Sequence, residues 1–121
     1  MTPSSWELIG RIALAAGLTA VVGLERELSR HPAGIRTHAI VGIGAALFTV
    51  AGAYGFSPHD SSPTRVAAQV VTGIGFLGAG TIIRQQDKVK GLTTAATLWL
   101  AAGIGISAGA GLLALTLGAF V

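Results

Sequence analysis

Glu25-Arg26-Glu27 is the most charged point of the sequence and follows a long apolar stretch. Magnesium prefers oxygen ligands and usually keeps several of its waters when one or two carboxylates hold it. Glu25 and Glu27 are therefore candidate ligands for Mg²⁺, although Arg26 between them can already neutralise their charge. The alternative interpretation is a solvated helix end, where the three charges mark only the point at which the chain enters water.

Other polar residues stand at the ends of apolar stretches or inside them. Arg36 comes just before the second apolar stretch, where an arginine can lie among lipid headgroups or reach inward to Glu25 or Glu27. Gln69 lies about one turn inside the third stretch, where a glutamine usually contacts other helices, with the lining of a polar path as the alternative. We predict a functional cluster made of Glu25, Arg26, Glu27, Arg36, Thr37, His38, Gln69, Thr93, Thr94 and Thr97.

The run Gly73-Ile74-Gly75-Phe76-Leu77-Gly78 matches the dinucleotide-binding pattern G-x-G-x-x-G. That pattern binds a dinucleotide only between a strand and a helix, with an acidic residue about 20 positions further on. Position 98 is a leucine and residues 91–121 contain no acid, so we reject this interpretation. Small residues instead let membrane helices approach closely. We predict helix packing at Gly73, Gly75, Gly78, Gly80, Gly105 and Gly109.

The composition indicates an integral membrane protein. Charged residues make up 11% of the 121 residues and hydrophobic residues 51%, with a mean hydropathy of +0.70. Soluble domains carry about 25% charged residues, and small ones need them to cover a large surface. The net charge of +3 does not indicate nucleic acid, because the Lys and Arg residues are spread along the chain. Without Cys and without a Ser/His/Asp or His-Glu-x-x-His pattern, we expect no enzyme and no resident cofactor, with Mg²⁺ left open.

Apolar stretches predict an all-α polytopic membrane bundle of four to five transmembrane helices with glycine-rich faces. About 20 residues are needed to cross the hydrocarbon. The first stretch covers residues 6–24, and the uncharged runs 39–56 and 66–83 supply the second and third. Residues 91–121 are too long for one span, so we expect a fourth helix over 93–108, a turn at 109–111 and the start of a fifth. We expect one transmembrane domain over residues 1–121, with its fifth helix truncated at Val121.

Local signals predict how two of these helices begin. Ser4 and Glu7 have the spacing of a capping box, and Glu7 can also pair with Arg11 one turn later. Ser62 followed by Pro63 is typical of a helix start, because proline is tolerated at the first helical position. We therefore expect the first helix to start near Ser4 and the third at Pro63.

The basic residues predict the orientation. The segment 25–36 holds Arg26, Arg30 and Arg36, the segment 84–90 holds Arg84, Lys88 and Lys90, and the connection between the second and third helices holds only Arg65. Short loops rich in Lys and Arg stay in the cytoplasm. We therefore expect the loops 25–36 and 84–90 in the cytoplasm and the N-terminus outside.

Five runs together resemble the MgtC/SapB family of bacterial inner-membrane proteins. They are residues 23–27 (GLERE), 33–38 (AGIRTH), 44–48 (GAALF), 73–80 (GIGFLGAG) and 91–99 (GLTTAATLW), in the order that the family shows. Ile35 stands where leucine is more usual, and Arg30-His31 departs from the basic residue expected before Pro32. The resemblance covers about residues 20–111 and implies localisation in the bacterial inner membrane.

The resemblance also implies a function and leaves three forms of it open. Family members are associated with growth in low Mg²⁺ and, in pathogens, with virulence. The first form is a non-enzymatic protein of magnesium or ion homeostasis, the second is an ion transporter or channel, and the third is a regulatory module that binds a membrane partner such as the ATP synthase. The family often carries a C-terminal cytoplasmic domain, which residues 1–121 lack. Besides the lipid bilayer, we expect a second copy of the chain as a partner, as a homodimer.

Overall fold

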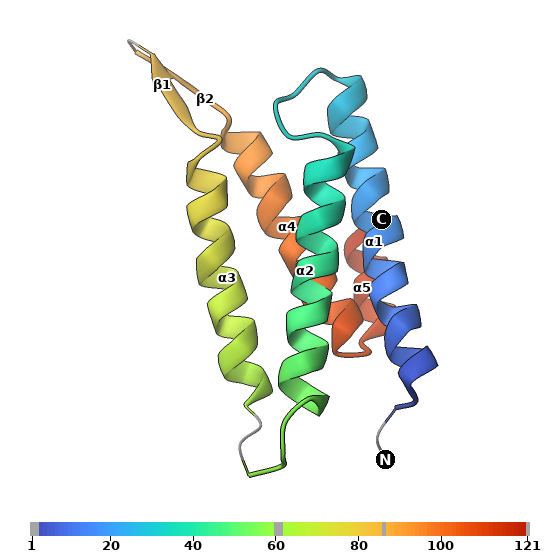
Figure 1. Cartoon of the computed structure of the whole chain (residues 1–121). Helices are drawn as coiled ribbons and strands as arrows, with labels where there is room; N and C mark the ends of the chain where they lie inside the picture. Colours follow the sequence, from blue (N-terminus) through green and yellow to red (C-terminus); the bar gives the residue numbers. More distant parts are fainter. Residues whose placement is uncertain (1–2, 60–61, 86, 121) are drawn as a thin grey trace.

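The computed structural model describes residues 3–59, 62–85 and 87–120 and is an antiparallel bundle of helices (Figure 1). The helices described in these ranges are α1 (Ser5–Leu28), α2 (Ile35–Tyr54), α3 (Pro63–Ala79), α4 (Leu92–Gly109) and α5 (Leu113–Phe120). The strands β1 (Ile83–Gln85) and β2 (Lys88–Lys90) form a hairpin between α3 and α4. The predicted all-α membrane bundle is confirmed.

Three helices, α1, α2 and α4, are long and apolar enough to cross a membrane. They form the centre of the bundle, because α2 packs extensively on both α1 and α4. Helix α3 lies beside α2 and α4 on the outside (Figure 1). Its 17 residues correspond to a length of about 26 Å, slightly less than the roughly 30 Å of hydrocarbon.

The helix starts agree with the local sequence signals. Ser4 is the N-cap of α1, and its side-chain oxygen accepts a hydrogen bond from the backbone N–H of Glu7 at 3.2 Å. Ser62 precedes α3 and Pro63 is its first residue, although the Ser62 side chain makes no capping hydrogen bond. The signals therefore place both helix starts correctly.

The central helices approach closely because small residues line their contacts. At Gly105, a side-chain carbon would lie 2.5 Å from the Gly42 carbonyl oxygen and 2.6 Å from the Ala45 side chain. Only glycine fits this crossing of α4 over α2, since the opposing atoms belong to backbone or to a side chain that cannot rotate away. The buried core accordingly consists mainly of alanines with a few larger residues, among them Leu98 and Ile104.

The third helix ends earlier than its apolar run predicts. We expected it to reach Ile83, but α3 ends at Ala79 and Ile83 begins a strand in which it pairs with Lys90. Hydropathy cannot place this boundary, because isoleucine is as apolar in a strand as in a helix and prefers the strand. Gly91 then turns the chain into α4 with a φ of +93°, a conformation that favours glycine.

The two ends of the bundle hold different segments of the chain. The hairpin end holds the β-hairpin, the α1–α2 loop and the first turn of α4, and the opposite end holds the start of α1 and the α2–α3 connection (Figure 1). Helix α5 follows a turn at Gly111 and folds back on α4, where Ser107 and Thr116 share a hydrogen bond of 2.8 Å between their hydroxyls.

Candidate functional site

Four of the predicted polar residues form one buried network at the hairpin end. The Arg26 Nη2 donates to the Thr94 hydroxyl at 3.3 Å, and the Thr97 hydroxyl lies 2.8 Å from the Thr94 carbonyl oxygen. The His38 Nε2 lies 3.0 Å from the same Thr97 hydroxyl. The network therefore joins α1 through Arg26, α2 through His38 and α4 through the two threonines.

The hydrogen bonds of His38 constrain its ring. Its Nδ1 lies 2.9 Å from the Gly34 carbonyl oxygen, which only accepts, so Nδ1 carries a proton. Nε2 then accepts from the Thr97 hydroxyl in the neutral ring and donates to it in the charged ring. Because Thr97 has one hydroxyl proton, it bonds to the Thr94 carbonyl only when Nε2 is the donor. Both ring nitrogens of the fully buried His38 thus have a hydrogen-bond partner within the protein.

Arg26 is the least satisfied member of the network. The residue is 7% exposed, and its buried Nε finds no acceptor among the described residues. The described part of the chain also provides no carboxylate within 4.0 Å of its guanidinium, since the ion pair found there joins Arg11 to Glu7. A buried cation without a counter-charge is costly in any low-dielectric environment. The site is therefore electropositive.

The spacing of small residues along α1 brings Arg26 into the bundle. The buried positions of this helix are Ala15, Thr19, Gly23 and Arg26, which recur every three or four residues and so share one face. At Gly23 a side-chain carbon would lie 2.6 Å from the Ile35 Cα, so α2 begins directly against α1. Arg26 follows one turn later on the same face and extends to the first turn of α4.

The other charged and hydroxyl residues of the predicted cluster lie outside this network. Glu25, Glu27, Arg36, Thr37 and Thr93 are all exposed. The Glu25 carboxylate accepts from the Ser29 hydroxyl at 3.1 Å, whereas the Glu27 side chain lies against Gly34. Arg36 makes no ion pair with either glutamate in the part of the chain that the structure covers.

The two glutamates therefore do not converge on one point. Residues two apart on a helix do not face each other, and these two have different neighbours. No group of three or more His, Cys, Asp or Glu side chains comes together in residues 3–59, 62–85 and 87–120. The proposed Mg²⁺ ligands Glu25 and Glu27 stay a prediction for a largely hydrated ion.

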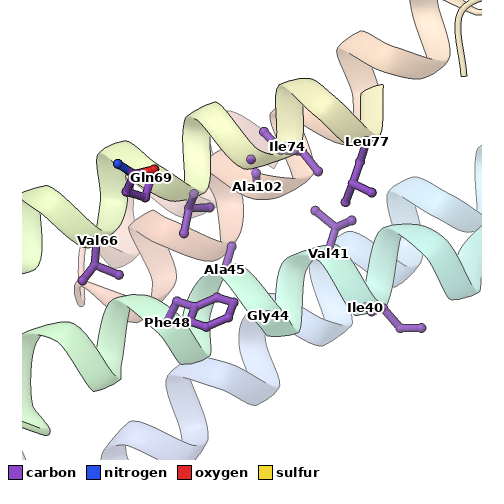
Figure 2. Close-up of a pocket in the computed structure, with 12 residues that line it drawn as sticks. Ile40, Val41, Gly44, Ala45, Phe48, Val66, Gln69, Ile74, Leu77 and Ala102 are labelled. Atoms are coloured by element: carbon purple, nitrogen blue, oxygen red, sulfur yellow. The ribbon is translucent and has the colours of Figure 1, made fainter. Parts of the chain in front are cut away.

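Gln69 lies apart from the network, in a groove between α2 and α3 (Figure 2). The groove has a volume of about 470 Å³ and is lined mainly by aliphatic residues, together with Phe48 and Gln69. Gln69 is exposed, so it adds one polar side chain to an otherwise apolar wall. The structure does not bring it to Arg26 or His38, which lie at the hairpin end.

The glycines predicted to pack have different surroundings in the structure. A side chain at Gly105 or Gly109 would meet backbone atoms of α2, so both lie at close helix contacts, and one at Gly78 would touch Ala95 at 3.5 Å. Gly80 ends α3 as its C-cap. At Gly73 and Gly75 nothing in the described chain lies within 4 Å of an added side-chain carbon, so helix packing at these two positions stays a prediction. Gly73 lines the groove between α2 and α3, so the open space beside it belongs to that groove.

A second polar cluster lies at the opposite end, and the sequence predicted only its Glu7–Arg11 pair. Arg11 donates to the Tyr54 hydroxyl at 3.2 Å and to the Gly109 carbonyl oxygen at 3.0 Å, and its guanidinium lies 5.8 Å from the centre of the tyrosine ring. The predicted pair with Glu7 also forms, at 3.4 Å. The single tyrosine at the end of an apolar stretch was the available signal, but its partner is 43 residues away.

Long apolar helices, small-residue contacts and a buried polar network together define a polytopic α-helical membrane protein. The sequence model of the MgtC family matches residues 12–121, so the chain belongs to the MgtC family. The family resemblance carried by the five runs is confirmed.

Curated relatives support this assignment. The chain is 45% identical over 112 residues to the "Putative magnesium transporter YhiD" of Escherichia coli (strain K12), an alignment that covers 88% of this chain and 52% of the relative. It is 51% identical over 96 residues to the "Protein MgtC" of Brucella abortus (strain 2308), covering 79% of this chain and 40% of that protein. The chain thus spans about half the length of the curated relatives it matches. No solved structure matches it significantly.

Proposed function

We propose that this chain is a non-enzymatic membrane domain that serves Mg²⁺ homeostasis. The observation that carries the proposal is membership of the MgtC family, together with 45% identity to a protein named as a putative magnesium transporter. The relatives are about twice as long as this chain, so the proposal concerns the contribution of this domain.

Within this role, a regulatory or binding function is favoured over conduction of Mg²⁺ through the single bundle. Two unit charges 4 Å apart interact by about 4 kcal/mol at an effective dielectric constant of 20, so a dication beside a guanidinium is repelled by roughly 8 kcal/mol. Arg26 is buried among α1, α2 and α4 without a carboxylate partner in the described residues. A path for Mg²⁺ between these helices would have to pass this charge.

The distribution of exposed basic residues supports one orientation in the membrane. We place the chain in the bacterial inner membrane, with the loops 25–36 and 84–90 in the cytoplasm and the N-terminus outside. Support comes from the hairpin end, where Arg30, Arg36, Arg84, Lys88 and Lys90 are all exposed, whereas the sequence between α2 and α3 contains no Lys or Arg and Arg65 follows in the first turn of α3.

The outer face of α3 is the proposed surface for assembly. At Gly75 nothing in the described chain lies within 4 Å of an added side-chain carbon, and Phe76 beside it is 83% exposed. Small residues on an unpacked membrane helix favour a helix–helix contact with another chain. A homodimer is the first candidate, and a membrane partner such as the ATP synthase is the second. Crosslinking in native membranes distinguishes a dimer band from a heteromeric one.

Two measurements test the proposal. The chain is expressed in a bacterium that lacks its own MgtC-family gene, and growth is followed at limiting and at ample Mg²⁺. We expect improved growth only at limiting Mg²⁺. The purified chain is then reconstituted in liposomes that contain a Mg²⁺-sensitive dye, with a known Mg²⁺ channel as the positive control.

Their outcomes separate the alternatives. Growth rescue without flux supports the regulatory role. Rescue with a saturable flux assigns transport instead and overturns the argument from Arg26. If the domain fails to alter growth at either Mg²⁺ concentration while it is present in the membrane, this domain does not supply the magnesium function.

A further inference from the structure

Arg26 has donor groups that the protein leaves unused. Nη2 reaches Thr94, but the buried Nε has no acceptor in the region that the structure describes. The carbonyl oxygens at the end of its own helix are already engaged, since those of Glu25, Arg26 and Glu27 accept from the backbone N–H groups of Ser29, His31 and Arg30. The negative end of the α1 dipole therefore offsets part of the charge without supplying an acceptor.

The first turn of α4 adds further donors, since no side chain of the described residues caps its backbone N–H groups. Its N-cap is Gly91, which has no side chain to accept from the first backbone N–H groups. Thr94, the partner of Arg26, belongs to this turn, so the guanidinium lies at the positive end of the α4 dipole. A cation at this place is unfavourable unless an anion joins it. Leu92 and Thr93 on the same turn are exposed, so the turn is open from outside the bundle.

The charges around this turn also favour an anion. The exposed basic residues of the hairpin end outnumber its described carboxylates, and the glutamates that flank Arg26 are directed to Ser29 and to Gly34. Planar guanidinium groups and free N–H groups at a helix start are the donors that proteins use for phosphate. The hairpin end also lies where the apolar length of α1, α2 and α4 finishes, which is the depth of phospholipid headgroups.

We propose that Arg26, Thr94 and the first turn of α4 bind the phosphate group of an anionic ligand. The phosphate oxygens accept from the guanidinium and from the free backbone N–H groups, and their charge balances Arg26. The ligand is either an anionic phospholipid headgroup or a soluble phosphate, and the chemistry at the protein is the same for both. This site stands independently of the Mg²⁺ role, because growth rescue and phosphate binding are separate measurements.

The test measures binding to the whole chain in two arms. In the lipid arm, the chain in nanodiscs of phosphatidylcholine is compared with nanodiscs that contain phosphatidylglycerol of the same acyl chains, and retained lipid is counted by native mass spectrometry. In the soluble arm, the chain in uncharged detergent is titrated with inorganic phosphate and with glycerol 3-phosphate at constant ionic strength. The thermal unfolding midpoint reports binding in both arms.

Arg26→Gln and Arg84→Gln form the matched pair. Both remove one guanidinium from the hairpin end, but Arg84 is exposed on β1. We expect Arg26→Gln to weaken phosphate binding at least about tenfold, as the loss of a charge-assisted hydrogen bond implies. Arg84→Gln should change binding less than about threefold, since it contributes only screened surface charge.

Each outcome decides the proposal. Arg26-dependent retention of phosphatidylglycerol alone identifies a lipid site, and Arg26-dependent binding in detergent without lipid identifies a soluble phosphate. Equal losses in Arg26→Gln and Arg84→Gln, or no loss in either, overturn it. If Arg26→Gln does not fold, Arg26→Lys keeps the charge without the planar fork and is expected to bind more weakly than wild type. A wild-type protein that neither arm stabilises also refutes the site.

Discussion

Replacing Gly105 with alanine tests the close approach of α2 and α4. The added carbon would lie 2.5 Å from the Gly42 carbonyl oxygen and 2.6 Å from the Ala45 side chain. Relaxed contacts between such atoms need about 3.3–4.0 Å. The two helices must therefore separate by roughly 1 Å at the crossing. A gap of that size forfeits a quarter to a half of the dispersion energy of the contacts it opens.

The expected cost follows from this separation. Overpacking a well-packed core usually costs about 1–3 kcal/mol, and the upper part of this range applies here because the opposing atoms are mainly backbone. Gly103→Ala is the matched control on the same helix, since nothing lies within 4 Å of a side chain at that position. In a helix interior this control gains up to about 1 kcal/mol, because alanine is the better helix former.

The assay is reversible unfolding in mixed micelles of a mild detergent and dodecyl sulfate, followed by circular dichroism. We expect the free energies of unfolding of the two variants to differ by about 2–4 kcal/mol, with Gly105→Ala the less stable. Equal stabilities would refute the reasoning, since a crossing that accepts a methyl group cannot be as close as described. Gly109→Ala should repeat the effect one turn further along, where the Ala46 carbonyl oxygen lies 2.8 Å from the added carbon.

Three further predictions use the same unfolding assay. Thr94→Val removes the acceptor of a buried guanidinium and is expected to lower the free energy of unfolding by about 1–3 kcal/mol. Thr93→Val, on the exposed neighbour, should change it by no more than about 0.5 kcal/mol. Similar values for the two variants would mean that the Arg26 hydrogen bond contributes nothing to stability. Gly91→Ala forces alanine to a φ of +93° and should cost about 1–3 kcal/mol, which an unchanged unfolding midpoint would contradict. Glu7→Gln breaks an ion pair whose carboxylate side chain is 57% exposed, so it should cost at most about 1 kcal/mol, and a larger loss would show that the pair organises the opposite end.

Hydropathy and local capping signals predicted most of the fold. The apolar runs located the helices, because only helices satisfy the backbone within hydrocarbon over such lengths. Between Ala79 and Leu92 the charges predicted an exit into water, but they did not predict the β-hairpin in which Ile83 pairs with Lys90. Strand pairing depends on partners across the turn, and a window of hydropathy does not contain that information.

The candidate site was predicted in composition but not in arrangement. Each residue of a helix is turned by about 100° from the previous one, so Glu25, Arg26 and Glu27 cannot all face the bundle. We grouped the three residues by their charge, but only Arg26 is buried, because it continues the buried face of α1 that holds Thr19 and Gly23. That spacing was available as a signal and would have separated the buried cation from the exposed acids. The link between His38 and Thr97 was not, since it joins helices 59 residues apart.

Stability alone does not explain an arginine at position 26. A methionine of similar length would fill the same space among α1, α2 and α4 without the cost of burying a charge, and such replacements of buried charges are often neutral or stabilising by about 1–4 kcal/mol. We therefore expect Arg26→Met to unfold no more easily than wild type in phosphate-free detergent, and to lose the stabilisation that a phosphate ligand gives to wild type. A variant that unfolds as readily as a cavity mutant, with or without phosphate, would show that Arg26 is retained for packing. If Arg26→Met is instead as stable as wild type and no longer responds to phosphate, the unpaired buried cation is retained for the ligand it binds. Ionisable residues inside membrane proteins usually have such a functional role.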